Sequence, residues 1–384
     1  MKPTNFLFNI ALTAATLSSL VTAWPGLANL QKDLNKRLPQ VAPADDGDGD
    51  GSATGAGELI GDLKNGITTP VGQTIANILT GKETGQSAAT YRIPGLPGTK
   101  ACKADPCCIW AHISFDLTLA FRGPSGRCNS LARQAIRLGF HDAAAWSKTR
   151  GGGGADGSIV LSGSEIKRPD NKGLEGIVAK AWALQKIFGP FGVGMADLIQ
   201  FAANHAVVTC PLGPRTRTFI GRKDAPAGIA APDGLMPDVN SDASTLIKLF
   251  EDKTITPHML AALVGAHTTS QQFFVDPKKA GQPQDGTPGV WDTLFYSQTI
   301  SGTPDKVFRL KSDMALANDS RVADEWNQFA GPGGQSHWNE DYASSYIRLS
   351  LLGVNNINSL TECTKVLPAA RPTFSFAGQL YVDQ

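Results

Sequence analysis

Apolar residues that recur every three to four positions dominate the chain from residue 100 onward. This spacing predicts helices, because residues at i, i+3, i+4 and i+7 share one helix face. Strand-like runs are few, and loops rich in glycine and proline separate the helices. We therefore expect a mainly α domain over about residues 101–375, followed by a tail over 376–384. The helical segments are expected at 128–141, 174–188, 195–208, 243–250, 257–267, 323–329 and 342–352.

The first hundred residues follow a different pattern. Lys2, a mostly apolar run over 6–21 and the small residues of V-T-A before Trp24 predict a signal peptide over 1–23. Residues 24–100 are predicted to form a flexible extension rich in Asp and Gly, because DDGDGDGSATGAG cannot bury a core. An EF-hand loop is the alternative for this run, but Gly57 stands where that motif requires Glu.

Charge and cysteine content narrow the class of protein. Lys and Arg number 35 against 34 Asp and Glu, which gives no case for nucleic acid or an anionic membrane as partner. No segment after the predicted signal is apolar enough to cross a bilayer. We expect a secreted, extracellular protein. Its six cysteines predict three disulfides, whose pairing the residues alone leave open. Zinc binding by Cys102–Cys108 is less favoured, because no second pair has finger-like spacing.

The run R-L-G-F-H-D carries the first candidate chemistry. Arg137 and His141 are four residues apart, so a helix places them on one face. A neutral His141 can move a proton between the two oxygens of a peroxide, and Arg137 can stabilise the negative charge that develops as the bond breaks. Phe140 would supply an apolar wall. Such a pair is also common on solvated helix faces.

A glycine-rich run follows this helix. GGGGADGS at 151–158 offers the oxygens of Asp156 and Ser158, which together with Asp142 suit a calcium ion. A flexible glycine loop is the alternative. The order RLGFHDA and then GGGGADGSI resembles the class II secretory haem peroxidases of fungi. The resemblance implies a haem-peroxidase fold, in which two helical halves hold the haem between them.

The resemblance assigns roles on the distal side of that haem. Arg137 and His141 would be the distal pair, Asn171 would hold His141, and Glu165 would hold Asn171. The first calcium ion would have the ligands Asp142, Gly154, Asp156 and Ser158.

On the proximal side, L-V-G-A-H-T resembles the helix that carries the axial ligand of the iron. His267 would bind the iron and Asp313 would accept a hydrogen bond from it. Taken alone, His267 is better explained as a core histidine that closes a helix. DGTPGVWD at 285–292 resembles the second calcium loop, whose ligands would be Thr268, Asp285, Thr287, Val290 and Asp292.

The same resemblance covers the cysteines and the channel region. It implies the disulfides Cys102–Cys108, Cys107–Cys363 and Cys128–Cys210. Gly221-Arg222 and PDGLMP at 232–237 are similar to the family's substrate-channel region. The only N-x-[ST] sequon places a glycan at Asn318.

Several positions depart from the family. A manganese site needs three carboxylates, but the matching positions hold Ser130, Gln134 and Phe273. Ala262 stands where lignin peroxidase has an exposed tryptophan, and Gln284 and Phe274 replace a usual Phe and a usual acid. Buried packing is the expected role of Trp146, Trp182, Trp326 and Trp338, with oxidation of a substrate at one of them as the alternative. The remaining histidines match no ligand pattern, namely His112, His205, His258 and His337.

The resemblance thus implies a monomeric peroxidase with one haem b and two Ca²⁺ ions. It would use H2O2 to oxidise small phenolic and aromatic reductants by one-electron steps through an oxo-iron(IV) intermediate. The alternative is a catalytically weak secreted protein that binds calcium and haem with the same fold.

Overall fold

A computed structural model of the chain describes residues 57–302 and 305–374, and the mainly α prediction is confirmed. The predicted signal peptide and the tail over 376–384 lie outside these residues. One short antiparallel pair, β1 (Phe219–Ile220) with β2 (Thr361–Glu362), joins Phe219 to Glu362 and Ile220 to Thr361. The helices and 3-10 turns are η1 (Gly61–Asn65), α2 (Pro70–Leu79), α3 (Lys100–Lys103), α4 (Cys108–Phe121), α5 (Ser130–Ala143), α6 (Ser158–Leu161), η2 (Glu165–Lys167), η3 (Pro169–Asn171), α7 (Glu175–Phe188), η4 (Gly189–Phe191), α8 (Met195–Thr209), α9 (Ala243–Glu251), α10 (Pro257–Val264), η5 (Gly265–Thr269), η6 (Pro277–Lys279), α11 (Leu294–Ser301), α12 (Lys311–Ala317), α13 (Ala323–Ala330), α14 (Gly334–Leu349), η7 (Ile357–Ser359) and η8 (Thr364–Val366).

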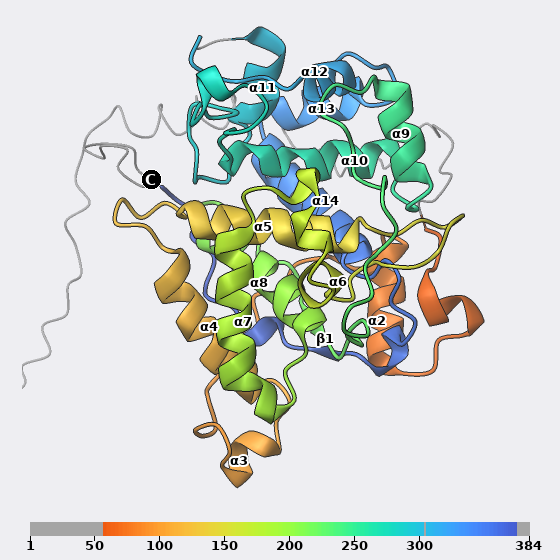
Figure 1. Cartoon of the computed structure of the whole chain (residues 1–384), viewed down its shortest axis with the longest axis vertical. Helices are drawn as coiled ribbons and strands as arrows, with labels where there is room; N and C mark the ends of the chain where they lie inside the picture. The colour runs from red at the N-terminus through yellow and green to blue at the C-terminus, as the bar shows by residue number, and fades with distance from the viewer. Residues whose placement is uncertain (1–56, 303–304, 375–384) are drawn as a thin grey trace, which may run out of the picture. The chain divides into compact units, whose positions relative to one another are not determined.

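The helices form two groups that meet at α14. α4, α5, α7 and α8 pack on one another in the first group, and α9 to α13 form the second. α14 contacts α10 in the second group, while its Tyr346 hydroxyl donates to Gln200 of α8 at 3.0 Å. In Figure 1, α5 and α10 lie one above the other, with α14 crossing behind them. The two predicted helical halves are therefore present.

Local capping explains where the two site helices begin. The Asn129 side chain accepts the N–H of Ala132 at 3.1 Å and starts α5. Thr256 accepts the N–H of Met259 at 3.3 Å, and Pro257 occupies the first turn of α10. α14 begins at Gly334, earlier than the predicted residue 342.

Close packing against α8 fixes α5. A Cβ atom on Gly139 would lie only 2.3 Å from the Tyr346 hydroxyl and 2.5 Å from the Ala203 methyl group. The Gly139 carbonyl instead accepts a hydrogen bond from Gln200 Nε2 at 3.0 Å. Any larger residue at this position would push α5, and with it the predicted distal pair, away from α8.

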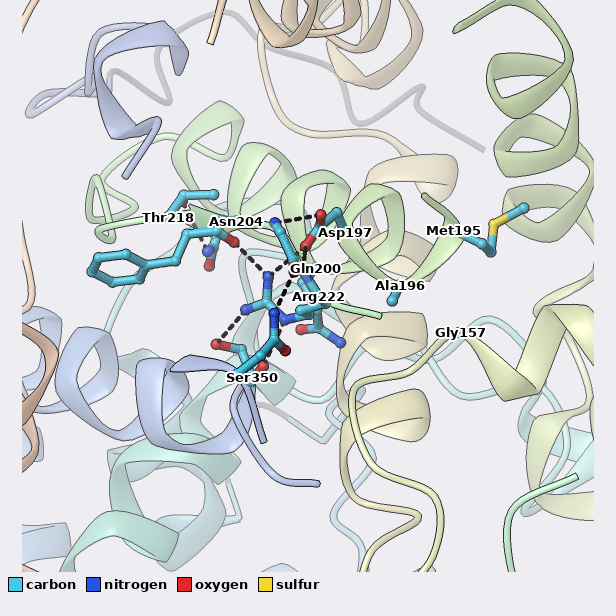
Figure 2. A network of polar contacts seen from close by, with 12 residues as sticks. Gly157, Met195, Ala196, Asp197, Gln200, Asn204, Thr218, Arg222 and Ser350 are labelled. Carbon is cyan, nitrogen blue, oxygen red and sulfur yellow. Dashed lines mark hydrogen bonds and ion pairs between the residues drawn. The ribbon is translucent and has the colours of Figure 1, made fainter. Parts of the chain in front are cut away.

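A buried ion pair anchors the other face of α8. Arg222 Nη1 lies 3.0 Å from Asp197 Oδ1, and Arg222 Nε donates to the main-chain oxygen of Ser350 at 2.9 Å. The main-chain N–H groups of Gly221 and Arg222 also donate to the Asp197 carboxylate. Figure 2 shows this network, which joins α8 to the chain after β1 and to the end of α14. Arg222 therefore has a buried structural role that joins these three segments.

Three disulfides are present, and their pairs are those that the resemblance implies. Cys102–Cys108 is local and lies at the start of α4. Cys128–Cys210 joins the residues just before α5 to the end of α8, and Cys107–Cys363 joins the start of α4 to the segment after β2. Among the described residues no cysteine is free.

The predicted extension needs a correction at its C-terminal part. Residues 57–100 are not a featureless linker, because α2 buries Ile75, Ile78 and Leu79 against the domain and contacts η7 and α14. Thr69 caps α2 and also donates to the main-chain oxygen of Asn358 at 2.7 Å. Helix α2 was not predicted because the Asp- and Gly-rich run before it led to the whole of residues 24–100 being assigned as flexible. Residues 24–56 lie outside the described part of the chain.

The tryptophans divide into two kinds. Trp326 and Trp338 are fully buried, as expected, whereas Trp182 on α7 is 47% exposed. The expectation that Trp182 packs in the core is therefore wrong.

Within residues 57–302 and 305–374 no helix combines the length and apolar content that a membrane span requires.

Candidate active site

A chain of hydrogen bonds orients His141 at the end of α5. Its Nδ1 lies 2.7 Å from Asn171 Oδ1, and Asn171 Nδ2 donates to the main-chain oxygen of Glu165 at 2.8 Å. The second bond fixes the orientation of the amide, so Asn171 presents an acceptor to the imidazole. In neutral His141 the proton therefore resides on Nδ1, and Nε2 keeps a lone pair.

Glu165 holds Asn171, as expected, but through its main-chain oxygen and not through its carboxylate. Its main chain holds Asn171, while its buried carboxylate accepts the N–H of Ala231 at 2.9 Å and lies 3.8 Å from Arg168. The Glu165 side chain thus ties η2 to the segment around residue 231. The sequence could not distinguish main-chain from side-chain contact.

His141 is held in its neutral form. Burial and the positive charge of Arg137 lower the pKa of His141 to about 3. The imidazole is therefore a base over the whole range in which the protein would work.

Arg137 and Phe140 flank this base. Arg137 donates to the main-chain oxygens of Lys172 at 2.8 Å and Asp170 at 2.5 Å, which holds the guanidinium against η3. The Phe140 ring lies edge-on to His141, with 5.6 Å between ring centroids, and stacks on Phe250. Arg137, Phe140 and His141 thus lie together, as expected.

A small pocket lies beside His141. Its lining includes Asn171 and Asp170, and the segment 232–236 forms its other wall. This segment belongs to PDGLMP, which the sequence analysis placed near the channel.

The rim next to Arg137 is aromatic. A Cβ atom on Gly173 would lie 2.6 Å from the Phe274 ring, and Lys172 Nζ lies 4.8 Å from the centroid of that ring. Phe273 and Phe274 are each 48% exposed. At the positions of a manganese site, Gln134 is engaged with Ser130 Oγ at 3.3 Å and with the N–H of Ile177 at 3.1 Å.

His267, in η5, has the geometry expected of an axial ligand. Its Nδ1 lies 3.1 Å from Asp313 Oδ2, which leaves Nε2 for an iron. The His267 side chain is 37% exposed, although η5 buries its neighbours Gly265 and Thr268. A core histidine that closes a helix would be covered.

Gln284 also reaches the Asp313 carboxylate. Its Nε2 donates to Asp313 Oδ2 at 3.3 Å, and its Oε1 accepts from the Ser270 hydroxyl. Two donors, the imidazole and this amide, therefore share one carboxylate oxygen. This contact between segments distant in the chain was missed, although Gln284 was noted as a departure.

The predicted distal calcium ligands converge with unsatisfied oxygens. Asp142 Oδ1 and Ser158 Oγ are buried and have no hydrogen-bond partner. Burial raises the pKa of Asp142 well above its usual value, and the charge of Asp156 raises it further. The Gly154 carbonyl accepts the N–H of Asp156 at 2.8 Å. Buried carboxylates with orphaned oxygens fit a cation.

The predicted proximal ligands are also buried together. The Thr268 hydroxyl donates to Asp285 Oδ2, and the Thr287 N–H donates to Asp285 Oδ1 at 2.8 Å. Burial and the charge of Asp292 raise the pKa of Asp285 well above its usual value. Val290 is fully buried in the same loop. Two adjacent buried carboxylates again suit a divalent cation.

An exposed imidazole backed by a carboxylate, and a second imidazole beside an arginine, fit the class of haem peroxidases. The comparisons with known proteins agree. A model of the family described as Peroxidase matches residues 120–332. Ligninase H2 of Phanerodontia chrysosporium is 34% identical over 323 residues, which cover 76% of this chain and 84% of that protein. A peroxidase of Arthromyces ramosus is 31% identical over 297 residues, covering 71% and 79%. Ligninase C of Trametes versicolor is 34% identical over 310 residues, covering 73% and 80%.

The chain therefore belongs to the peroxidase family and, within it, to the class II fungal peroxidases. It is a haem-dependent enzyme.

Proposed function

We propose that this chain is a secreted peroxidase that uses H2O2 to oxidise small phenolic and aromatic reductants, one electron at a time. The observation that carries the proposal is the pair of oriented imidazoles. His141 keeps Nε2 free because Nδ1 is bonded to Asn171, and His267 keeps Nε2 free because Nδ1 is bonded to Asp313. The exported location is supported by the three disulfides.

Haem b, when bound through His267, supplies the redox-active iron. The residues of the chain handle the proton and the charge. His141 Nε2 removes the proton from one oxygen of H2O2 and returns it to the other, so that this oxygen leaves as water. Arg137 stabilises the negative charge on the departing oxygen. Two reductant molecules then each give one electron, so that H2O2 and two phenols yield two water molecules and two phenoxyl radicals.

The reductant is proposed to be organic rather than Mn²⁺. A hard divalent ion needs oxygen ligands of negative charge. Ser130, Gln134 and Phe273 offer none, and the amide of Gln134 is already engaged. The exposed Phe273 and Phe274 present an apolar rim instead.

Two calcium ions are proposed to hold the two helical halves in register. The distal ion would have the ligands Asp142, Gly154, Asp156 and Ser158. The proximal ion would have Thr268, Asp285, Thr287, Val290 and Asp292. We further propose that the enzyme is a monomer, and that exposed Asn318 carries a glycan.

The test uses purified haem-loaded protein with a phenol, a non-phenolic aromatic and Mn²⁺ as reductants. We expect H2O2-dependent phenol oxidation that falls by about 10²–10⁴-fold in His141→Ala, while the Soret band stays. His112→Ala, which removes a histidine on α4, should match the wild type. Haem binding without peroxide consumption would instead favour the catalytically weak binding protein, and an unimpaired His141→Ala would refute the mechanism.

A further inference from the structure

Two histidines that match no ligand pattern in the sequence lie in one cluster with two carboxylates. His258 is in the first turn of α10, Glu325 is on α13, and His337 and Asp341 are one turn apart on α14. The three helices contact one another; α10 and α13 belong to the second helical group, and α14 lies where the two groups meet. The cluster is separate from the residues assigned above to haem and calcium.

The atoms of the cluster are spaced like the ligands of one metal ion. His258 Nδ1 lies 3.2 Å from Glu325 Oε2, and His258 Nε2 lies 3.5 Å from Asp341 Oδ2. His337 Nε2 lies 3.3 Å from Glu325 Oε1 and 2.9 Å from Asp341 Oδ2. With metal–ligand bonds of about 2.0–2.1 Å, neighbouring atoms of a tetrahedral site are about 3.3–3.4 Å apart. A metal ion takes one nitrogen from His258, and single ligand atoms of His258, Glu325 and Asp341 lie within 4.8 Å of one another, so the side chain of His337 would turn toward them to complete the shell.

The buried carboxylates point independently to a ligand. Glu325 is only 8% exposed, and its Oε1 and the solvent-inaccessible Oδ2 of the partly exposed Asp341 have no partners except the imidazoles of these ion pairs. Their positive partners in the ion pairs are imidazoles, which are charged only when protonated. When the imidazoles are neutral, these carboxylates have no counter-charge, and a metal cation among them would supply it.

We propose that His258, Glu325, His337 and Asp341 bind one divalent transition-metal ion, with zinc as the ion that fits best. Two imidazole nitrogens and two carboxylate oxygens are ligands that zinc accepts in a tetrahedral arrangement, whereas calcium takes six to eight oxygens. The half-exposed imidazoles give the ion a path from solvent. The ion joins the start of α10 to α13 and α14, and so stabilises the helix that leads to His267.

The test is a zinc titration of the calcium-loaded, haem-loaded protein in excess calcium, followed by chelator competition. We expect one zinc ion per chain, a dissociation constant at or below micromolar, and a rise in Tm of a few degrees at saturation. His258→Gln and His337→Gln should each weaken zinc binding at least about tenfold. His112→Gln is the matched control and should bind as the wild type does.

Asp341→Asn offers a nearly isosteric second variant should a histidine variant fold poorly. The Soret band and the Tm without zinc verify that each variant is folded and has kept its haem. Wild-type protein that takes up no zinc at about 100 μM overturns the proposal. So does a His258→Gln/His337→Gln protein that binds zinc as tightly as the wild type.

Discussion

Single hydrogen bonds decide the chemical state of the two site histidines. The Asn171 amide can present only its oxygen to His141, because its Nδ2 is bonded to the Glu165 main chain. Burial and Arg137 then keep the ring neutral. At His267 the partner is a carboxylate, which gives the imidazole anionic character instead. His141 is thus prepared to accept a proton, and His267 to donate electron density to an iron.

The state of His141 sets a pH dependence. Because its pKa is lowered to about 3, the rate constant for reaction with H2O2 should be level from about pH 5 to 8 and fall as the pH approaches 3. Arg137→Leu removes one cause of the low pKa and should move this acid limb to higher pH. Stopped-flow measurements across this range test both statements.

Arg92→Leu, which removes an exposed arginine, should leave the acid limb in place. An identical limb in Arg137→Leu would contradict the coupling between the two residues. The lowered pKa of His141 also makes the free energy of unfolding depend on pH. Below about pH 6.5 the imidazole is protonated in the unfolded chain but not in the folded one, so the free energy of unfolding should fall as the pH drops.

Gln284 predicts a shift in the reduction potential. Its amide and His267 donate to the same oxygen of Asp313, so the amide weakens the carboxylate as a partner of the imidazole. Gln284→Leu should therefore lower the Fe(III)/Fe(II) midpoint potential, on the order of tens of millivolts. Asp313→Asn should shift the potential in the opposite direction. Spectroelectrochemical titration of the Soret band measures both, and equal potentials in wild type and Gln284→Leu would exclude this role.

At the scale of elements, glycines permit the close contacts that position the site. A Cβ atom on Gly265 would lie 2.2 Å from the Tyr296 hydroxyl and 2.6 Å from Trp338 Nε1. Gly139 serves α5 in the same way. The proximal segment can therefore rest directly on an aromatic cluster in which Trp291 and Trp338 stack with 4.8 Å between centroids.

The loop after η5 predicts a dependence on calcium. Thr268 directly follows His267 and shares the buried Asp285, so the ion that these oxygens would bind should hold η5 in place. We expect two calcium ions per chain in the wild type and one in Asp285→Asn, whose Tm should fall by several degrees. Atomic absorption and thermal unfolding provide the measurements. Asp324→Asn, at an exposed acid on α13, is the control, and two ions retained by Asp285→Asn would rule out this ligand.

The prediction from sequence succeeded where a motif is local. The helices around Arg137 and His267 have clear periodicity and caps, and their chemistry is contained in a few consecutive residues. It failed where the information is tertiary. α4 was not predicted because its own apolar residues lie on most of its faces, so they show no helical period. The first turns of α14 are polar and also show no period. That His258 and His337 approach the same two carboxylates follows only from the packing of three helices.

The whole domain includes more of the N-terminal region than its composition indicates. A protein that starts at residue 80 lacks α2, whose Ile75 is fully buried, and should be less stable than one that starts at residue 57. Ile75→Ala alone should cost about 2–4 kcal/mol. Urea unfolding of the three proteins gives the comparison. Equal midpoints for the two truncated chains would show that α2 does not contribute to the core.

The bridge between Cys107 and Cys363 spans 256 residues of the chain. A ribosome must therefore deliver nearly the entire domain before this covalent link can form. Until then Cys107 has no native disulfide partner. The Cys102–Cys108 and Cys128–Cys210 bonds, which span 6 and 82 residues, can close while the chain is still being made, so only the Cys107–Cys363 bond must follow synthesis of nearly the whole domain.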